Sequence, residues 1–252
     1  LDAMERNLGV KLFSRTRDGM RLLPAGQEVL EALDRVALEL ETITRRLRAR
    51  DASLAGSVSL SAPELLLTLL LPDLCQFKTE YPELRLDLRP LELPDGVESG
   101  PADLAIRETN NPSPDLIGRN LGRYAMAIYG TPELLNRSEP AARPEGLCWI
   151  DAAQPHTAAA ELKRRFYPAV EQLFVSESAS VRLAALRLGL GIGPLPCVVG
   201  DCHAELARAA AEPLEVGGLW LLSHPDLRQV PRVQALSGFV QTVFRNAFQD
   251  AV

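Results

Sequence analysis

The sequence of 252 residues lacks any hydrophobic run long enough to cross a membrane. Its apolar stretch Leu65–Leu71 is far shorter than the roughly 20 residues that a membrane-spanning helix needs. Residues 1–23 are charged throughout and contain no apolar segment of the kind found in secretory signals. We therefore expect a cytoplasmic protein with no membrane partner.

Cysteine is also scarce, which limits redox and metal chemistry. The four cysteines show no framework spacing, which suits a reducing compartment; they are Cys75, Cys148, Cys197 and Cys202. Cys197, Cys202 and the adjacent His203 lack the fourth ligand that a structural zinc site needs. We expect structural thiols and no bound metal.

Signatures of catalysis are missing as well. The three histidines do not accompany carboxylates in a recognisable relay. The glycine-rich stretch 189–193 follows a predicted helix and lacks dinucleotide-binding spacing, so we interpret it as a helix end and a turn. Ser176 and Ser178 lack the G-x-S-x-G pattern of a hydrolase nucleophile. The sequence favours a protein that is not an enzyme and holds no cofactor.

Charge is distributed unevenly along the chain. The formal net charge of −6 on its own argues against a nucleic-acid partner. Residues 1–50, however, contain 10 Lys and Arg against 8 Asp and Glu, a net charge of +2, whereas the remainder contains 17 against 25, a net charge of −8. A basic end and an acidic body suit a protein that touches DNA with one part only.

Residues 12–22 predict a hairpin of two short strands around a tight turn at Asp18-Gly19, because both residues tolerate positive φ. Basic side chains crowd this hairpin; they are Lys11, Arg15, Arg17 and Arg21. Two interpretations fit the pattern. The hairpin is either an ordinary solvated one or a cationic wing that contacts the phosphate backbone of DNA.

A long helix is predicted to follow the hairpin. Pro24 suits its first turn, where backbone N–H groups lack helical partners, and after Gly26 no glycine or proline occurs before Gly56. Its apolar residues show the alternating spacing of four and three that defines a coiled-coil seam: Val29, Leu33, Val36, Leu40, Ile43 and Leu47. So narrow a stripe favours a homodimer over a helix packed on its own domain. Such a dimer would present two wings at the fixed separation that two DNA half-sites require.

Beyond a connection at 51–56, predicted strands and helices alternate. Strands are predicted at 57–61, 84–89, 102–107, 124–129, 147–150, 172–175 and 219–223, with a strand or buried loop at 192–199. Helices are predicted at 63–81, which Pro72 would kink or divide, and at 132–136, 178–188 and 233–248. This alternation predicts α/β lobes with mostly parallel sheets, in which ligands bind at the carboxyl ends of strands.

In this order, the wing, the long helix and the α/β lobes resemble a LysR-type transcriptional regulator over essentially the whole chain. The resemblance is carried by residues 8–16, 19–26, 71–72, 77, 81–82, 102–107 and 219–228. It implies the remnant of a winged helix-turn-helix DNA-binding domain at 1–23 and a dimerising linker helix at 24–50. It also implies an effector-binding domain at 56–252, similar to periplasmic binding proteins. Lobe I would comprise 57–122 and 219–252, and lobe II 123–218.

The resemblance further implies homodimers that assemble into homotetramers, promoter DNA as a partner, and transcription controlled by a small molecule held between the lobes. The implied effector-binding residues are Ser61, Ala62, Pro63, Glu64, Ile106, Arg107, Ser176 and Ser178. Many relatives have a hydroxyl residue where Ala62 falls, and Glu64 adds a negative charge, so an anionic effector is disfavoured there. Ser178 would contact effector, cap a helix or do both. Arg107 would bind an anion or pair with Glu108 or Glu64.

The base-reading helix-turn-helix is expected to precede Leu1, because residues 1–8 resemble only the tail of its recognition helix. A wing alone would hold phosphates without specifying bases. The alternative interpretation is a solute-binding protein of the periplasmic type with no DNA role. The missing export signal and the predicted coiled coil count against that alternative.

Overall fold

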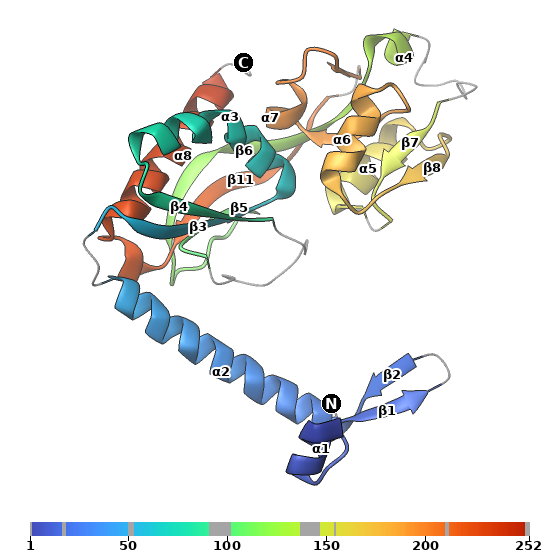
Figure 1. The fold of residues 1–252 in the computed structure, drawn as a ribbon. Helices are drawn as coiled ribbons and strands as arrows, with labels where there is room; N and C mark the ends of the chain where they lie inside the picture. The colour runs from blue at the N-terminus through green and yellow to red at the C-terminus, as the bar shows by residue number, and fades with distance from the viewer. Residues whose placement is uncertain are drawn as a thin grey trace. The chain divides into compact units, whose positions relative to one another are not determined.

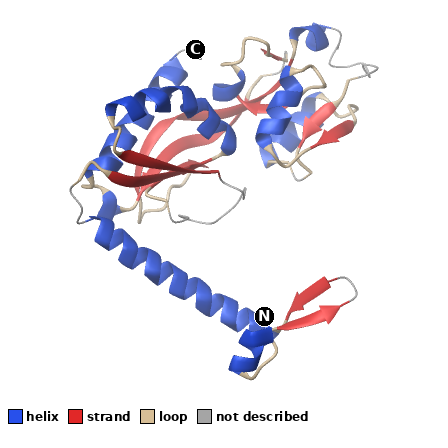
Figure 2. Cartoon of the chain, in the orientation of Figure 1, coloured by secondary structure: helices blue, strands red, loops and turns tan. Residues whose placement is uncertain are grey.

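The computed structural model describes residues 2–16, 19–49, 53–90, 102–136, 147–153, 155–209 and 212–249. The chain divides into two compact units, residues 1–51 and 52–252. Figure 1 labels the elements of each unit along the chain, and Figure 2 shows them by type. None of the helices in the described ranges combines the length and the hydropathy that a membrane crossing requires.

The first unit contains a short helix, a hairpin and a long helix. These elements are α1 Asp2–Leu8, β1 Phe13–Thr16, β2 Gly19–Leu22 and α2 Pro24–Ala49. The strands are antiparallel, and Thr16 pairs with Gly19. Gly19 is therefore a paired strand residue, so the prediction of a turn centred on Asp18-Gly19 was wrong for Gly19, and Asp18 lies outside the described residues. Gly19 does use a positive φ, of 126°, but as the first residue of β2.

The start of the hairpin packs on the first turn of α2. Leu12 is 2% exposed, and its carbonyl oxygen accepts a hydrogen bond of 2.8 Å from the backbone N–H of Leu23. A Cβ on Gly26 would lie 2.3 Å from that same carbonyl oxygen. Only glycine at position 26 therefore permits this approach, although glycine is a poor helix former.

The second unit contains a large mixed sheet, a small sheet and the helices around them. Its strands are β3 Gly56–Ala62, β4 Leu84–Pro90, β5 Leu104–Thr109, β6 Ile117–Gly130, β7 Trp149–Asp151, β8 Gln172–Val175, β9 Gly193–Pro196, β10 Ala207–Arg208 and β11 Leu214–Ser223. Its helices are α3 Glu64–Glu80, α4 Pro132–Asn136, α5 Thr157–Phe166, α6 Ala179–Arg187, α7 Cys197–Gly200, the 3-10 helix η1 Pro225–Leu227, and α8 Pro231–Gln249.

The large sheet has the strand order β10-β6-β11-β5-β3-β4, with β9 also paired to β6. β3 is parallel to β4 and β5, but β11 is antiparallel to both β5 and β6. The prediction of mostly parallel sheets is thus wrong for the part of this sheet built on β6 and β11, whose pairings are all antiparallel. Polar residues occupy the first half of β6 and glycines the first half of β11, so apolar patterning revealed only part of each strand.

Lobe I denotes below the part built on β3, β4 and β5, and lobe II the part that contains the small parallel sheet of β7 and β8. β6 and β11 run through both parts as continuous strands. In Figure 1 these two strands extend from the region of β3–β5 toward the region of α5–α7.

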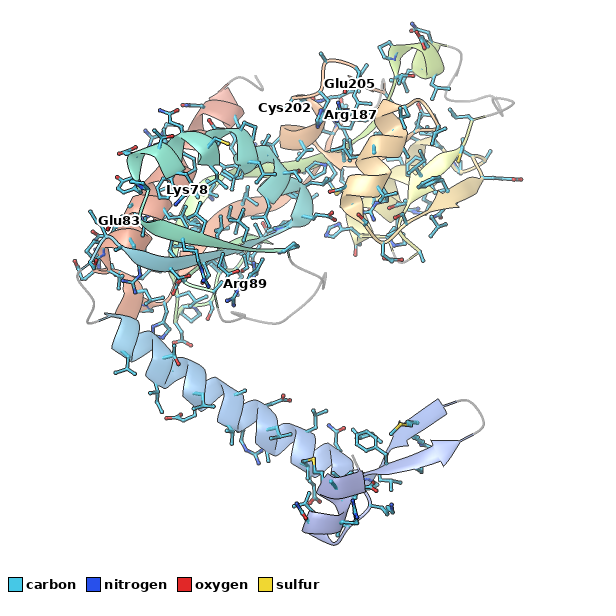
Figure 3. The ribbon with its side chains drawn as sticks, in the orientation of Figure 1. Lys78, Glu83, Arg89, Arg187, Cys202 and Glu205 are labelled. Atoms are coloured by element: carbon cyan, nitrogen blue, oxygen red, sulfur yellow. The ribbon has the colours of Figure 1, made fainter. Side chains whose placement is uncertain are left out.

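Helices α3 and α8 form the core of lobe I against the sheet. The fully buried side chains, all at most 1% exposed, are Leu66, Leu70, Phe77, Leu236, Val240 and Phe244. The ring of Phe77 lies 4.9 Å from the ring of Phe239, centroid to centroid. α3 continues through Pro72 without being divided. Lys78, labelled in Figure 3, donates from Nζ to the carbonyl oxygens of Pro82 and Leu84 and thereby ties the end of α3 to β4.

Lobe II contains two helices that were not predicted from the sequence, α5 and the short α7, and one helix end that was predicted. The prediction of a strand or buried loop at 192–199 holds only for β9, because the chain turns into α7 at Cys197. After α6, the N–H groups of Gly189 and Leu190 bond to the carbonyl oxygens of Leu186 and Ala185, both at 3.0 Å, and Gly189 has a φ of 71°. This is the Schellman arrangement, which needs a left-handed residue after the helix. The interpretation of the glycine-rich stretch as a helix end is confirmed.

Candidate functional site

In the first unit, Glu5 joins α1 to the hairpin. Its carboxylate accepts hydrogen bonds from the backbone N–H groups of Leu12 (2.8 Å) and Phe13 (3.2 Å), and from Lys11 Nζ at 2.6 Å. These bonds, the one from Lys11 foremost, lower the pKa of Glu5 to about 2. Lys11, a predicted DNA-backbone contact, is therefore ion-paired, although its own side chain is 74% exposed.

The other predicted DNA contacts lie on the hairpin strands and turn. Arg21 is exposed on β2, Arg15 belongs to β1, and Arg17 lies outside the described residues. A groove of about 460 Å³ runs where the hairpin meets α2; it is lined by Ser14, Arg21, Leu22, Leu23, Pro24 and Gln27. A cation, a hydroxyl and an amide thus share one concave surface, a donor set that matches phosphate oxygens.

The predicted coiled-coil stripe is unburied within the chain. Val29 is half-buried, and the exposed fractions of the rest are 53% for Leu33, 56% for Val36, 59% for Leu40, 45% for Ile43 and 63% for Leu47. Aliphatic side chains in a continuous exposed row are uncommon on a monomer and are typical of an interaction surface.

In lobe I, Ser61 near the end of β3 and Arg107 within β5 come together. Arg107 Nη2 donates to Ser61 Oγ at 3.1 Å, and Nη1 donates to the carbonyl oxygens of Ile106 (3.0 Å) and Ser61 (3.4 Å). Partial burial lowers the pKa of this guanidinium. Neither of the predicted pairings of Arg107 with Glu108 or Glu64 is among its hydrogen bonds. Its donors point instead to uncharged oxygens of its own lobe.

Glu64, the first residue of α3 in lobe I, reaches the N-terminus of α6 in lobe II. Its Oε2 accepts from the backbone N–H of Ala179 at 2.9 Å, and its Oε1 accepts from Ser178 Oγ at 3.4 Å. Ser178 is also the N-cap of α6, since its Oγ accepts from the backbone N–H of Val181 at 3.3 Å. The predicted capping role of Ser178 is thus present.

A second polar contact between the lobes pairs His156 with Glu108. His156 Nδ1 accepts from the backbone N–H of Ala158 at 3.2 Å and caps α5. A neutral ring that accepts at Nδ1 carries its proton on Nε2, which lies 3.6 Å from Glu108 Oε1. Partial burial raises the pKa of Glu108, and His156 opposes that rise. Sequence reasoning missed this pair because the two residues are far apart in the chain and neither belongs to a motif.

The remaining predicted effector residues are divided between the surface and the core. Pro63 and Ser176 are half-buried at strand ends, and the carbonyl oxygen of Ser176 accepts from Arg182 Nη1 at 2.6 Å. Ala62 and Ile106 are 0% exposed and face the interior of lobe I. The structure therefore brings Glu64 to Ser178 and Arg107 to Ser61, while the side chains of Ala62 and Ile106 are buried in the core of lobe I.

Other polar clusters of lobe II join its own elements. Tyr129 OH donates to Asp201 Oδ1 at 2.7 Å and accepts from Arg208 Nε at 3.1 Å, which ties β6 to the segment after α7. Arg187 and Glu205, labelled in Figure 3, form an ion pair between α6 and a loop. All four cysteines are free thiols, and among the described side chains no group of three or more His, Cys, Asp or Glu is arranged to hold a metal ion.

Comparison with known proteins agrees with this architecture. Residues 51–245 match the family model described as LysR substrate binding domain. The chain is 28% identical to the probable HTH-type transcriptional regulator LtrA of Klebsiella pneumoniae, over 94% of this chain and 82% of that protein. It is 27% identical to the glycine cleavage system transcriptional activator of Escherichia coli K12, over 95% of this chain and 81% of that protein.

Solved structures show the same fold. The full-length virulence activator AphB of Vibrio cholerae, a member of the LTTR protein family, has a TM-score of 0.59 and 19% identity over 95% of this chain and 86% of that chain. The effector domain of the regulator AmpR of Pseudomonas aeruginosa also has a TM-score of 0.59, with 16% identity over 77% of this chain and 98% of that domain. Residues 52–252 thus form a two-lobed α/β domain of the periplasmic-binding-protein type. The chain belongs to the LysR family of transcriptional regulators and carries its effector-binding domain.

Proposed function

We propose that this regulator divides its work among three segments. The wing in residues 1–23 contacts the DNA backbone, the helix in 24–50 dimerises, and the domain in 56–252 binds a small-molecule effector where lobes I and II meet. The dimers associate further into tetramers in the cytoplasm. The related proteins are transcriptional regulators, which are not enzymes. The observation that carries the proposal is the exposed aliphatic stripe of α2.

That stripe supports dimerisation through its energy and its shape. Burying an exposed aliphatic side chain contributes about 1.5–3 kcal/mol, so the row from Leu33 to Leu47 is a large unused driving force for association. Its narrow a/d spacing matches a second helix of the same kind better than the broad face of a globular core. A second copy of this chain provides such a helix.

The wing supports contact with DNA because Arg21, together with Ser14 and Gln27, lines the groove beside the hairpin. Lys and Arg that neutralise phosphates release counterions, so each contact steepens the fall of affinity with salt. The bonds of Glu5 to Lys11 and Leu12 hold the start of the hairpin against α1, and Arg21 is exposed on β2.

The junction of the lobes supports effector binding because two helix N-termini and two strand ends meet there. Glu64 begins α3, Ser178 caps α6, Ser61 is the residue before the end of β3, and Arg107 lies within β5 beside it. Convergent polar side chains beside helix N-termini are what a small polar ligand requires. We place the effector against these groups.

The wing is tested by measuring the binding of a duplex of arbitrary sequence at several salt concentrations. Replacing Arg15 and Arg17 together with alanine should weaken binding similarly for all sequences and reduce the slope of log affinity against log salt by up to roughly two. The matched control replaces Arg228 and Arg245, which are exposed in the effector domain, and should leave the slope unchanged. An unchanged slope in the wing variant would remove the wing from the DNA contacts.

A further inference from the structure

Glu64 contacts the N-terminus of α6 in the way that a bound carboxylate ligand would, although its carboxylate is part of the chain. The backbone N–H of Ala179 is the first amide of α6 and has no acceptor within the helix. It donates to Glu64 Oε2 at 2.9 Å, while Ser178 Oγ donates to Glu64 Oε1. A helix N-terminus favours negative charge, and here a carboxylate from the opposite lobe supplies it.

The balance of effects on Glu64 indicates that these hydrogen bonds are strong enough to hold the ionised form. Partial burial raises the pKa of its carboxyl group, but hydrogen bonds from Ser180, Ala179 and Ser178 outweigh burial and lower the pKa below its ordinary value. The folded protein therefore retains a carboxylate at this position at neutral pH.

The nearby cations do not compete for this carboxylate. Arg107 directs its donors to Ser61 and to the carbonyl oxygen of Ile106, and Arg182 Nη1 donates to the carbonyl oxygens of Ser176 (2.6 Å) and Glu177 (3.0 Å). Glu64 is thus matched to the helix N-terminus and its serines, and an incoming carboxylate would meet a position that is already filled and negatively charged.

We propose that Glu64 is a specificity-determining residue of the junction: it occupies the N-terminus of α6 from lobe I, holds the lobes together there, and excludes effectors that would place a carboxylate at that end. This inference rests on the proposed effector function and adds the ligand class to it. The effector is a neutral or cationic small molecule at this end of the site, and Glu64 is the acceptor available to an amine or hydroxyl donor.

The first experiment replaces the missing group with its free equivalent. Glu64→Ala removes the atoms of an acetate ion, so sodium acetate should bind at the vacated helix N-terminus. We expect acetate to raise the thermal midpoint of the full-chain variant by at least about 1 °C relative to sodium chloride at the same concentration. Acetamide, which has the same shape without the charge, should have no such effect. The original chain, whose site is filled, should not respond to acetate. An equal response of both proteins to acetate, or none in either, would overturn the proposal.

The second experiment removes the donor instead of the acceptor. Ala179→Pro deletes the N–H that Glu64 accepts, at the helix position where proline is best tolerated, and Ser178 already has the extended conformation that precedes proline, with φ −71° and ψ 118°. The substitution should lower the thermal midpoint of the original chain more than that of the Glu64→Ala variant. Equal changes in the two backgrounds would show that residues 64 and 179 are not coupled and would refute the contact.

The outcomes separate this inference from the proposed function. If acetate does not distinguish the Glu64→Ala variant from the original chain while DNA binding still responds to an effector, the role of Glu64 is rejected and the proposed regulator function is retained. If acetate stabilises only the Glu64→Ala variant but no effector changes DNA binding, the contact of Glu64 with α6 is supported and the proposed effector site is rejected.

Discussion

Helices α2 and α8 are both long and amphipathic, but their apolar stripes differ completely in exposure. Val233, Leu236, Val240 and Phe244 of α8 are at most 3% exposed, whereas Leu40 and its neighbours on the α2 stripe are 45–63% exposed. The stripe of α8 includes aromatic residues and packs on the sheet and on α3. The stripe of α2 is strictly aliphatic and narrow. Periodicity predicts a helix in both places, but the width and composition of the stripe indicate which partner buries it.

The largest effect is expected from α8. Replacing Leu236, which is 0% exposed, with alanine should reduce the free energy of unfolding by about 2–5 kcal/mol, because the substitution removes buried methyl groups and leaves a cavity. Urea unfolding followed by circular dichroism measures this change, and sedimentation should show the same oligomer. If the Leu236→Ala variant kept its free energy of unfolding but changed its oligomeric mass, α8 would be the dimerising helix and not part of the core of lobe I.

A smaller effect per side chain is expected from α2. Because Leu40 is 59% exposed in the single chain, Leu40→Ala should forfeit about half of the 1.5–3 kcal/mol of a full burial in each chain, and the two chains together should raise the dissociation constant at least about tenfold. Analytical ultracentrifugation over a range of protein concentrations tests this. The control is Leu30→Ala, since Leu30 is 45% exposed on the same helix but lies outside the stripe. If Leu40→Ala leaves the association unchanged, the stripe is not the dimer seam.

The smallest effect is local and depends on pH. The pKa of Glu5 is about 2 in the folded protein against an ordinary value of 4.5. Its contribution to the stability of the hairpin is therefore complete above pH 4.5 and is lost as the pH falls through about 2. Amide exchange at Leu12 and Phe13, corrected for the intrinsic rate, should accelerate over this interval. The Glu5→Gln variant should already exchange faster at neutral pH, and equal protection in the two proteins there would contradict the role of Glu5.

Much of the fold followed from local patterns. The extent of α2, the continuous apolar face of α8 and the end of α6 at Gly189 depend on helix periodicity and on glycine, which are properties of neighbouring residues. The first half of β6 was missed because residues 117–123 contain too few apolar side chains at regular spacing to distinguish a strand from a loop. Helix α5 did carry a signal that was not recognised in the sequence, since Ala158, Leu162 and Phe166 follow helical spacing.

The contacts at the junction of the lobes were less accessible to sequence reasoning. Glu64 and Ala179 are far apart in the chain, and so are Glu108 and His156, so no spacing rule links them. The resemblance placed Glu64 and Ser178 near each other, but it did not predict that one would accept from the other. Arg107 shows the same difficulty, because its predicted partners were an anion, Glu108 or Glu64, whereas in the fold its donors reach Ser61 and the carbonyl oxygen of Ile106.

The continuity of β6 and β11 determines how the two lobes are able to move. Leu219 pairs with Gly122 and Glu215 pairs with Ala125, so a single ladder of backbone hydrogen bonds passes from one lobe to the other. Rotation of one lobe relative to the other must therefore twist the paired strands β6 and β11, because flexible loops do not make this connection. The twist is easiest at the register shifts between Glu215 and Gly217 and between Leu219 and Trp220, where the ladder is already interrupted. We therefore expect any change of angle between the lobes to concentrate at these two steps.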